Sequence, residues 1–269
     1  MDQQFVIEVF NLTKSFPGVI ALDDINLKVR AGSVHCIIGE NGAGKSTLVR
    51  ALTGLYKSDA GRILIDGRDV SVHRAAHDLI ACVPQEIDLF PNMTVAENLF
   101  MPFNKSGMKG PFVSKKMMNQ RAKERLAEFH INVNPQEMVR NISIAHQQLL
   151  QIARAETQTG YKVLIMDEPT TSLTNLEIEV LFRIVKRLQS EGKTIIFISH
   201  KLEEMFAIGT HVSILRNGCL VGELPIEQVD SKWIVTKMSG EEIDIDEVFR
   251  PTVPGGDVVM KVQHLDGIR

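Results

Sequence analysis

The chain has 269 residues, of which 44% are hydrophobic and 23% charged, and its formal net charge is −3 at neutral pH. These values are typical of a globular protein of one to one and a half domains, and the slight negative charge argues against nucleic acid as a partner. No apolar run is as long as a bilayer span, and the polar first four residues carry no signal-peptide pattern. We therefore expect a cytoplasmic chain that reaches a membrane only through a partner.

The first part of the chain predicts β structure. Residues 5–30 favour strands, and over 25–30 apolar and polar residues alternate, the pattern of a half-buried strand. Residues 34–38 form a short apolar run typical of a strand buried on both faces. Residues 61–70 predict a hairpin with its turn at Asp66-Gly67. Antiparallel strands therefore flank the buried one, and we expect them to form a small sheet against the core.

A glycine-rich loop follows the strand at 34–38. It reads Gly39-Glu40-Asn41-Gly42-Ala43-Gly44-Lys45-Ser46-Thr47 and matches the phosphate-binding pattern G-x-x-x-x-G-K-[ST]. A helix is predicted next, over 47–52. In such a unit, backbone N–H groups and the helix N-terminus surround phosphates. Lys45 would supply a charge to the outer phosphates, and the Ser46 hydroxyl would ligate Mg²⁺. The spacing and both flanks argue against a chance glycine turn.

Helical patterns dominate the middle of the chain, and we expect a helical subdomain over about 88–160. A capping box at Thr94–Glu97 predicts the start of a short helix, and residues 101–113 are typical of an irregular loop. Residues 114–130 carry apolar side chains at helix spacing, and the methionines among them are more typical of a core than of a ligand site. A further helix is predicted to start near Ser143.

Two further apolar strands are predicted at 163–166 and 194–199, with an amphipathic helix at 176–188 between them. Residues 211–224 predict a last hairpin about Asn217-Gly218. Three apolar strands separated by helices imply a parallel sheet with covered faces. The predicted fold class is therefore α/β, with a parallel sheet core, an antiparallel β subdomain and a helical subdomain. The phosphate-binding loop makes the chain resemble a P-loop NTPase, which implies a RecA-like core.

Polar residues follow these strands at their carboxyl ends, where ligands gather on parallel sheets. Asp167 suits a carboxylate that coordinates Mg²⁺ beside phosphates, and Glu168 suits a general base for attack on the γ-phosphate. His200 could hydrogen-bond that phosphate. The alternatives are a solvated strand end for the two acids and a structural role for the histidine. The apolar strand before the acids and Pro169 after them favour the catalytic role.

The end of the chain echoes its beginning. Residues 259–265 repeat three of the seven residues at 6–12, after an acidic stretch with Pro and Gly at 241–257 that is typical of a linker. We therefore expect one domain over 1–240, a linker over 241–257, and at 258–269 the first strand of a second copy of the domain, cut off at the last residue.

The order of these motifs resembles the ATP-binding subunit of ABC transporters over nearly the full chain. The resemblance implies ATP and Mg²⁺ as cofactors, with Ser46, Gln85 and Asp167 at the metal. By this resemblance, Phe16 stacks on adenine and Gly39–Thr47 is the Walker A loop. Gln85 is the Q-loop glutamine, which touches Mg²⁺ and faces the membrane partner. Val163–Asp167 is Walker B, Glu168 is the catalytic glutamate and His200 is the switch histidine.

Within this family, Ser15-Phe16-Pro17-Gly18 and Thr94-Val95-Ala96-Glu97-Asn98 look like the monosaccharide importers of the ribose and galactose type, which fuse two ATPase halves in one chain. The resemblance implies an ATP-hydrolysing motor, peripheral on the cytoplasmic face of the cell membrane. Its partners would be membrane permease subunits, the second ATPase half and, indirectly, a periplasmic or extracellular solute-binding protein.

Two motifs depart from the family. The signature Leu-Ser-Gly-Gly-Gln, which the resemblance places against the nucleotide of the opposite half, reads Ile142-Ser143-Ile144-Ala145-His146. Ser143 keeps its place at a helix N-terminus, where it can meet a γ-phosphate, but the lost glycines and glutamine argue against tight closure. The D-loop Ser-Ala-Leu-Asp reads Thr171-Ser172-Leu173-Thr174 and lacks its aspartate.

Two other classes of protein agree less well with the sequence. Soluble ABC-type ATPases of DNA repair carry long heptad coils between the two nucleotide motifs, which Thr47–Asp167 lacks. Those of translation should carry a basic linker, whereas 241–257 is acidic. A GTPase needs the string Asn-Lys-x-Asp, and the nearest match, Asn104-Lys105-Ser106-Gly107, lacks the aspartate.

Overall fold

The computed structural model describes residues 5–102 and 114–240. Most of the loop expected at 101–113, the linker at 241–257 and the repeated strand at 258–269 lie outside the described residues. The strands are β1 (Phe5–Phe16), β2 (Val19–Arg30), β3 (Val34–Ile38), β4 (Ala60–Ile65), β5 (Arg68–Asp69), β6 (Ile80–Val83), β7 (Val163–Asp167), β8 (Thr194–Ile198), β9 (His211–Arg216) and β10 (Cys219–Pro225). The helices are α1 (Lys45–Leu52), α2 (Val95–Phe100), α3 (Lys115–Glu128), α4 (Ile144–Glu156), α5 (Asn175–Ser190), α6 (Leu202–Ile208) and α7 (Ser231–Ser239), with short 3₁₀ turns at Arg74–Leu79, Val139–Asn141 and Ile226–Gln228.

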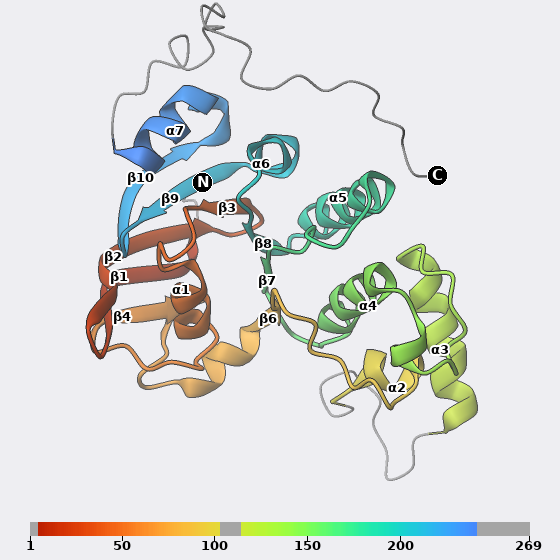
Figure 1. Ribbon diagram of the computed structural model, residues 1–269. Coiled ribbons are helices and arrows are strands. Elements are labelled where there is room, and N and C mark those ends of the chain that lie inside the picture. The colour runs from red at the N-terminus through yellow and green to blue at the C-terminus, as the bar shows by residue number, and fades with distance from the viewer. Residues whose placement is uncertain (1–4, 103–113, 241–269) are drawn as a thin grey trace, which may run out of the picture.

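A six-stranded sheet forms the centre of the molecule, in the order β10-β9-β3-β8-β7-β6 (Figure 1). The strands from β9 to β6 run parallel, and β10 returns antiparallel to β9. Every residue of β3, β7 and β8 is buried, as expected for parallel strands covered on both faces. The α/β class, the three buried strands and the last hairpin are confirmed. The strand β6 was not predicted, because it has only four residues and ends directly before Pro84.

The second sheet is antiparallel, in the order β2-β1-β4-β5. The alternating apolar residues of β2 are buried, as predicted. The β4–β5 turn places Asp66 at φ 53° and Gly67 at φ 74°, the left-handed conformations of a two-residue hairpin turn. This sheet and α1 cover one face of the central sheet, where their apolar side chains share a core with Ile37, Ile165 and Ile196.

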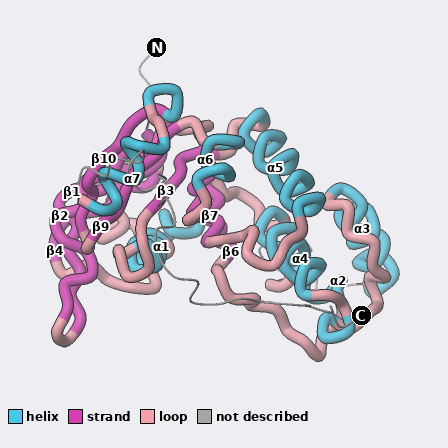
Figure 2. Tube along the Cα trace, turned by 45° about the horizontal axis from the view of Figure 1, so that its top comes forward, coloured by secondary structure: helices cyan, strands magenta, loops and turns pink. Residues whose placement is uncertain are grey.

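The helices α2, α3 and α4 form the helical subdomain, which lies away from the antiparallel sheet (Figure 2). A capping box at Thr94–Glu97 opens α2, and the Ser114 and Ser143 side chains cap α3 and α4. The predicted helix starts are therefore confirmed. The methionine prediction is only half right, since Met118 is buried whereas Met117 is 44% exposed. Neighbouring residues on a helix point in different directions, so both cannot face the core.

The helix α4 also holds the segment that follows β6. Gln151 of α4 is 1% exposed. Its Oε1 accepts a 2.6 Å hydrogen bond from the backbone N of Asp88, and its Nε2 donates to the backbone oxygens of Pro84 (3.0 Å) and Glu86 (3.4 Å). The buried Gln151 side chain therefore fixes the segment 84–88 to α4.

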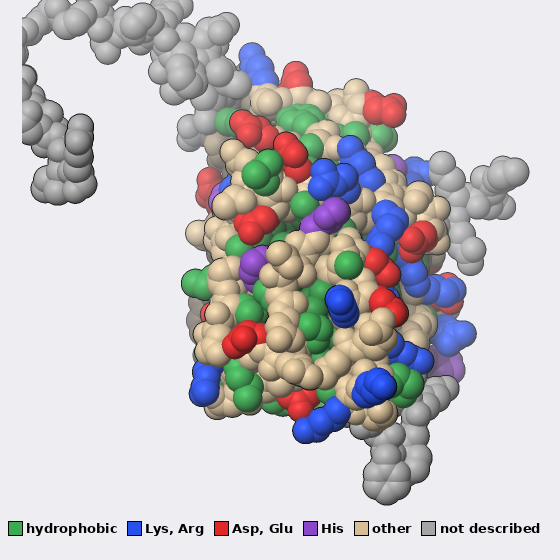
Figure 3. All heavy atoms as spheres, turned by 90° about the vertical axis from the view of Figure 1, so that its right-hand side faces the viewer, with side chains coloured by type: hydrophobic (Ala, Val, Ile, Leu, Met, Phe, Trp, Pro, Cys, Tyr) green, Lys and Arg blue, Asp and Glu red, His purple; other side chains and the backbone are tan. Residues whose placement is uncertain are grey.

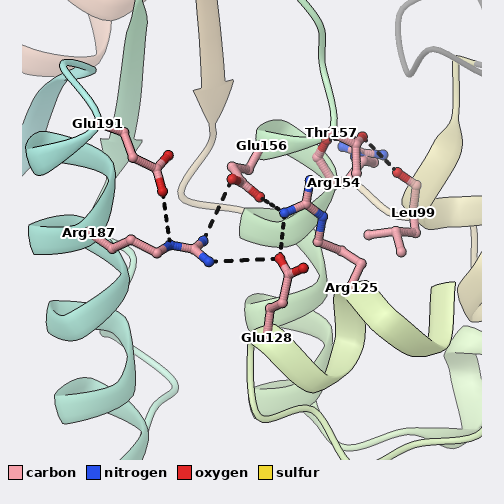
Figure 4. Close-up of polar contacts among 8 residues, drawn as sticks. All are labelled: Leu99, Arg125, Glu128, Arg154, Glu156, Thr157, Arg187 and Glu191. Carbon is pink, nitrogen blue, oxygen red and sulfur yellow. Dashed lines mark hydrogen bonds and ion pairs between the residues drawn. The ribbon is translucent and has the colours of Figure 1, made fainter. Parts of the chain in front are cut away.

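Charged side chains connect the helical subdomain to α5 (Figure 4). A guanidinium nitrogen of Arg125 in α3 lies 2.6 Å from a carboxylate oxygen of Glu128 and 2.7 Å from one of Glu156 in α4. Arg187 of α5 lies 3.6 Å from Glu156 and 3.7 Å from Glu128, nitrogen to oxygen. Burial raises the pKa of Glu156, and the two guanidinium groups oppose that shift. Ion pairs therefore join α3 to α4 through Arg125 and Glu156, and both helices to α5 through Arg187.

Basic and acidic side chains are interspersed on the side of the molecule that carries α3 and α5 (Figure 3).

None of the helices in residues 5–102 and 114–240 is long and apolar enough to cross a membrane.

Candidate active site

The glycine-rich loop lies between β3 and α1, as its sequence predicts. A β-carbon at Gly39 would lie 2.4 Å from the backbone oxygen of Leu215, and one at Gly44 would lie 2.6 Å from that of Ala21. Gly44 also has a φ of 106°, which residues with side chains rarely adopt. Glycine therefore allows the loop to pass this close to β9 and β2 before the chain enters α1.

The loop forms one wall of a pocket of about 590 Å³. The predicted site residues that line it are Phe16, Asn41, Gly42, Gly44, Lys45, Ser46, Thr47, Gln85, Asp167 and Glu168. Three residues of the loop are not among the described lining residues: Gly39, Glu40 and Ala43. Of these, Gly39 packs on β9 and Ala43 is 4% exposed. Residues far apart in the sequence thus meet at the carboxyl ends of the parallel strands, as predicted.

An apolar wall closes one side of this pocket. The Phe16 ring contacts the Tyr56 ring edge to face, with 5.4 Å between centroids, and Val19 and Ile20 beside it are 59% and 56% exposed. Val19, Ile20, Ala21 and Asn217 line the pocket but were not predicted. The sequence gives little sign that these residues bind a ligand. Val19 and Ile20, an apolar pair at the start of a strand, look like residues of the hydrophobic core.

Lys45 is 7% exposed, and its ammonium donates hydrogen bonds to the backbone oxygens of Gly39 (2.7 Å) and Glu40 (3.0 Å). Burial lowers the pKa of Lys45, while the nearby carboxylates of Glu168 and Asp167 oppose that shift. The buried ammonium is therefore held by loop carbonyls and faces two acidic groups.

Asp167 ends β7 and is 7% exposed. Burial raises its pKa, the Glu168 carboxylate raises it further, and Lys45 and Arg50 partly offset both. A cation at this carboxylate would relieve the repulsion. The described residues hold no group of three or more His, Cys, Asp or Glu able to bind a metal, but Mg²⁺ needs only one or two carboxylates when phosphates supply further oxygens. The Asp167 carboxylate and the Ser46 hydroxyl, which line the same pocket, therefore fit Mg²⁺.

Glu168 makes contacts on both sides of its carboxylate. Gln85 Nε2 donates a 3.2 Å hydrogen bond to Glu168 Oε2, and His200 Nδ1 lies 3.3 Å from Glu168 Oε1. The backbone is constrained too: Glu168 has a φ of 47°, uncommon outside glycine, and its carbonyl oxygen accepts a 3.0 Å bond from the Thr171 hydroxyl. Three predicted site residues from different parts of the chain are thus in contact, although His200 is not among the pocket's lining residues.

The signature residues are placed elsewhere. The Ser143 hydroxyl caps α4 by accepting a 3.2 Å hydrogen bond from the backbone N of His146, and Ile144 is 62% exposed. None of Ser143, Ile144, Ala145 and His146 is among the described residues that line the pocket. In the D-loop, Thr174 caps α5 instead of supplying an aspartate.

Comparisons with known proteins agree with these motifs. The family model described as "ABC transporter" matches residues 22–171. The chain is 39% identical to a putative ribose/galactose/methyl galactoside import ATP-binding protein of Geobacillus kaustophilus, over 98% of this chain and 53% of that one. It is 38% identical to the galactose/methyl galactoside import ATP-binding protein MglA of Salmonella typhimurium, over 99% of this chain and 52% of that one. The chain thus spans about half the length of the curated relatives it matches.

Solved structures show the same fold. The ADP conformation of MJ1267, an ATP-binding cassette of an ABC transporter, superposes with a TM-score of 0.70 at 27% identity, covering 88% of this chain and 100% of that one. A dimeric post-hydrolysis state of the cassette MJ0796, bound to ADP and Pi, gives 0.73 at 24% identity, covering 82% of this chain and 98% of that one.

Proposed function

Because the chain belongs to the ABC transporter family, we propose that it binds and hydrolyses ATP with Mg²⁺ and drives a membrane permease that imports a monosaccharide or a similar carbohydrate. The observation that carries the proposal is the single pocket into which the buried Lys45, the buried Asp167 and Glu168 converge. The import functions named for the relatives favour this role over DNA repair or translation.

Each wall of the pocket suits one part of ATP. Phe16, with Val19 and Ile20, offers apolar surface for the adenine. The loop Gly39–Thr47 and Lys45 suit the phosphates. Ser46, Asp167 and Gln85, which line the same pocket, would hold Mg²⁺, and the ion would supply positive charge against the charge that develops on the phosphates.

Glu168 is the candidate general base that accepts a proton from the attacking water. His200, in contact with Glu168, would complete this end of the site by a hydrogen bond to the γ-phosphate.

A second pocket supports a permease partner. It has a volume of about 660 Å³ and lies between α1 and the helical subdomain, where Leu55 and Phe90 are 74% and 47% exposed. Exposed apolar side chains in a concave surface favour a protein partner. Gln85 lines both this pocket and the nucleotide pocket, so a permease segment seated here would touch the residue that contacts Glu168. The protein would then be peripheral on the cytoplasmic face of the membrane, with a solute-binding protein on the other side.

Transport tests the proposal. The full protein that carries this chain, reconstituted in vesicles with its permease and solute-binding protein, should import ribose or galactose only with ATP and Mg²⁺. ATP hydrolysis without uptake of ribose, galactose or any other monosaccharide of a test panel, under conditions in which a known ribose importer works, would contradict monosaccharide import. Absence of any ATP binding would contradict the ATPase.

Replacing Phe16 by alanine should weaken ATP binding by about 1–3 kcal/mol, the range found for base–aromatic stacking. The matched control is Phe10→Ala, because Phe10 is also partly buried but is not among the residues of the pocket. Calorimetry with ATP and with inorganic tripolyphosphate separates the two possible causes. An equal loss for both ligands would show that the Phe16 ring only packs against Tyr56.

Because the signature lies outside the pocket, we propose that a second ATPase half supplies the opposite wall. The 269-residue chain by itself should therefore remain largely monomeric and hydrolyse ATP slowly. Ala145→Gly with His146→Gln should raise both ATP-dependent dimerisation and ATPase rate, because glycine allows closer backbone approach and glutamine restores the family's side chain.

Sedimentation with ATP measures dimerisation of two proteins, both carrying Glu168→Gln. One has the parent signature, and the other has Ala145→Gly with His146→Gln. A parent chain that already dimerises tightly, or a substituted one that behaves like the parent, would show that the departures from the family signature are harmless.

A further inference from the structure

A buried carboxylate on α6, that of Glu204, plays no part in the pocket described above. The residue is 5% exposed, and a carboxylate with so little solvent contact needs ionic or hydrogen-bond partners. Its partners are Ser199 and Lys201, the two neighbours of His200 in the chain.

The contacts of Glu204 enclose the turn that carries His200. The Ser199 hydroxyl donates a 2.6 Å hydrogen bond to Glu204 Oε2, and the hydroxyl oxygen accepts a 3.0 Å bond from the backbone N of Lys201. The Lys201 Nζ lies 3.0 Å from Glu204 Oε1. One carboxylate therefore holds the chain on both sides of His200, where β8 ends and α6 begins. Bonds to a charged acceptor are the stronger kind of hydrogen bond.

His200 itself has few restraints. Its side chain is 54% exposed, and within the described part of the chain its ring makes one polar contact, with the Glu168 carboxylate at 3.3 Å. A half-exposed side chain ordinarily samples several rotamers. The position of the ring therefore depends strongly on the backbone that carries it.

We propose that Glu204 is a positioning residue: it holds Ser199 and Lys201, and so sets the turn from which the His200 ring meets Glu168. Without the carboxylate, the Ser199 hydroxyl would lose its hydrogen-bond acceptor and the Lys201 ammonium its ionic partner, and the turn would be released. The effect on the rate rests on the proposed ATPase function. Because the ATP-contacting walls of the pocket do not include Glu204, its loss should lower kcat and leave the KM for ATP nearly unchanged.

A double-mutant cycle with the full protein tests whether Glu204 acts through His200. Glu204→Ala should lower kcat about tenfold in the parent and by less than about twofold in the His200→Ala background, since misplaced catalytic groups lose rate steeply with distance. Glu204→Gln keeps an oxygen for the Ser199 hydroxyl and should retain most of the rate. The matched control is Glu203→Ala, on the exposed side of the same helix, which should behave as the parent.

Equal losses of kcat in both backgrounds, or a rise in KM as large as the fall in kcat, would overturn the proposal in favour of a purely structural role. If Glu204→Ala unfolds at the assay temperature, Ser199→Ala removes the same hydrogen bond and serves in the same cycle.

A second measurement needs no hydrolysis. With labelled histidine, Glu168→Gln should shift the NMR signals of the His200 ring in the parent and leave them unshifted in Glu204→Ala. An equal shift in both would overturn the proposal. If the protein hydrolyses no ATP but this coupling is present, the ATPase proposal fails and the positioning role of Glu204 stands.

Discussion

The Glu168→Gln protein should bind ATP as the parent does and hydrolyse it about 10²–10⁴-fold more slowly, the range that general acid–base catalysis contributes. The amide has the shape of the carboxylate but cannot accept a proton from water. Its oxygen can still accept the hydrogen bond from Gln85 that Glu168 Oε2 accepts. The positive φ at this position is no harder for glutamine than for glutamate, so the turn after β7 should survive.

Calorimetric binding of ATP and single-turnover hydrolysis separate the two effects. Glu179→Gln is the matched control, because Glu179 is an exposed carboxylate on α5 that is not among the residues of the pocket. A Glu168→Gln protein that turned over ATP at the parent rate would remove Glu168 as the base, and one that no longer bound ATP would give the carboxylate a binding role instead.

Replacing Lys45 by alanine should weaken ATP binding at least tenfold, because a hydrogen bond to a charged group contributes about 1.5–3 kcal/mol. The fold should tolerate the change. Burial lowers the pKa of Lys45, which means that the folded protein disfavours the ammonium relative to the unfolded chain. Its removal should therefore leave the Tm of the nucleotide-free protein close to the parent's.

Calorimetry and thermal unfolding measure these two results, with Lys186→Ala as the control, since Lys186 is exposed on α5. Unchanged ATP affinity would show that the loop does not bind the phosphates. A large fall in Tm would show that Lys45 holds the loop together through Gly39 and Glu40 more than it serves a ligand.

The elements that the sequence predicts well are those whose signal is local. An unbroken apolar run predicts β3, β7 and β8, and a side-chain cap predicts the start of α3 and of α4. The helices α6 and α7 were not predicted, since each is short and follows a stretch that already reads as strand or turn. Whether Met117 or Met118 faces the core depends on the neighbours of α3, which the helical period alone does not supply.

The residues of the candidate site also differ in how well the sequence predicts them, depending on whether their signal is local. Lys45, Asp167 and Glu168 lie in local motifs, and the sequence identifies them. The contact of Gln85 with Glu168 joins residues 83 positions apart, and only the order of the parallel strands brings them together. Glu204 could not be distinguished from its exposed neighbour Glu203, because burial, not residue type, separates the two.

Through Gln151, one helix connects the signature with the segment that carries Gln85. Ser143 lies eight positions before Gln151, so at 1.5 Å per residue the two are roughly 12 Å apart along α4. Gln151 is hydrogen-bonded to the segment 84–88, and the Gln85 side chain in that segment is hydrogen-bonded to Glu168. If α4 moves as a rigid body, a displacement of the signature would therefore be passed on to the residue that contacts the candidate base.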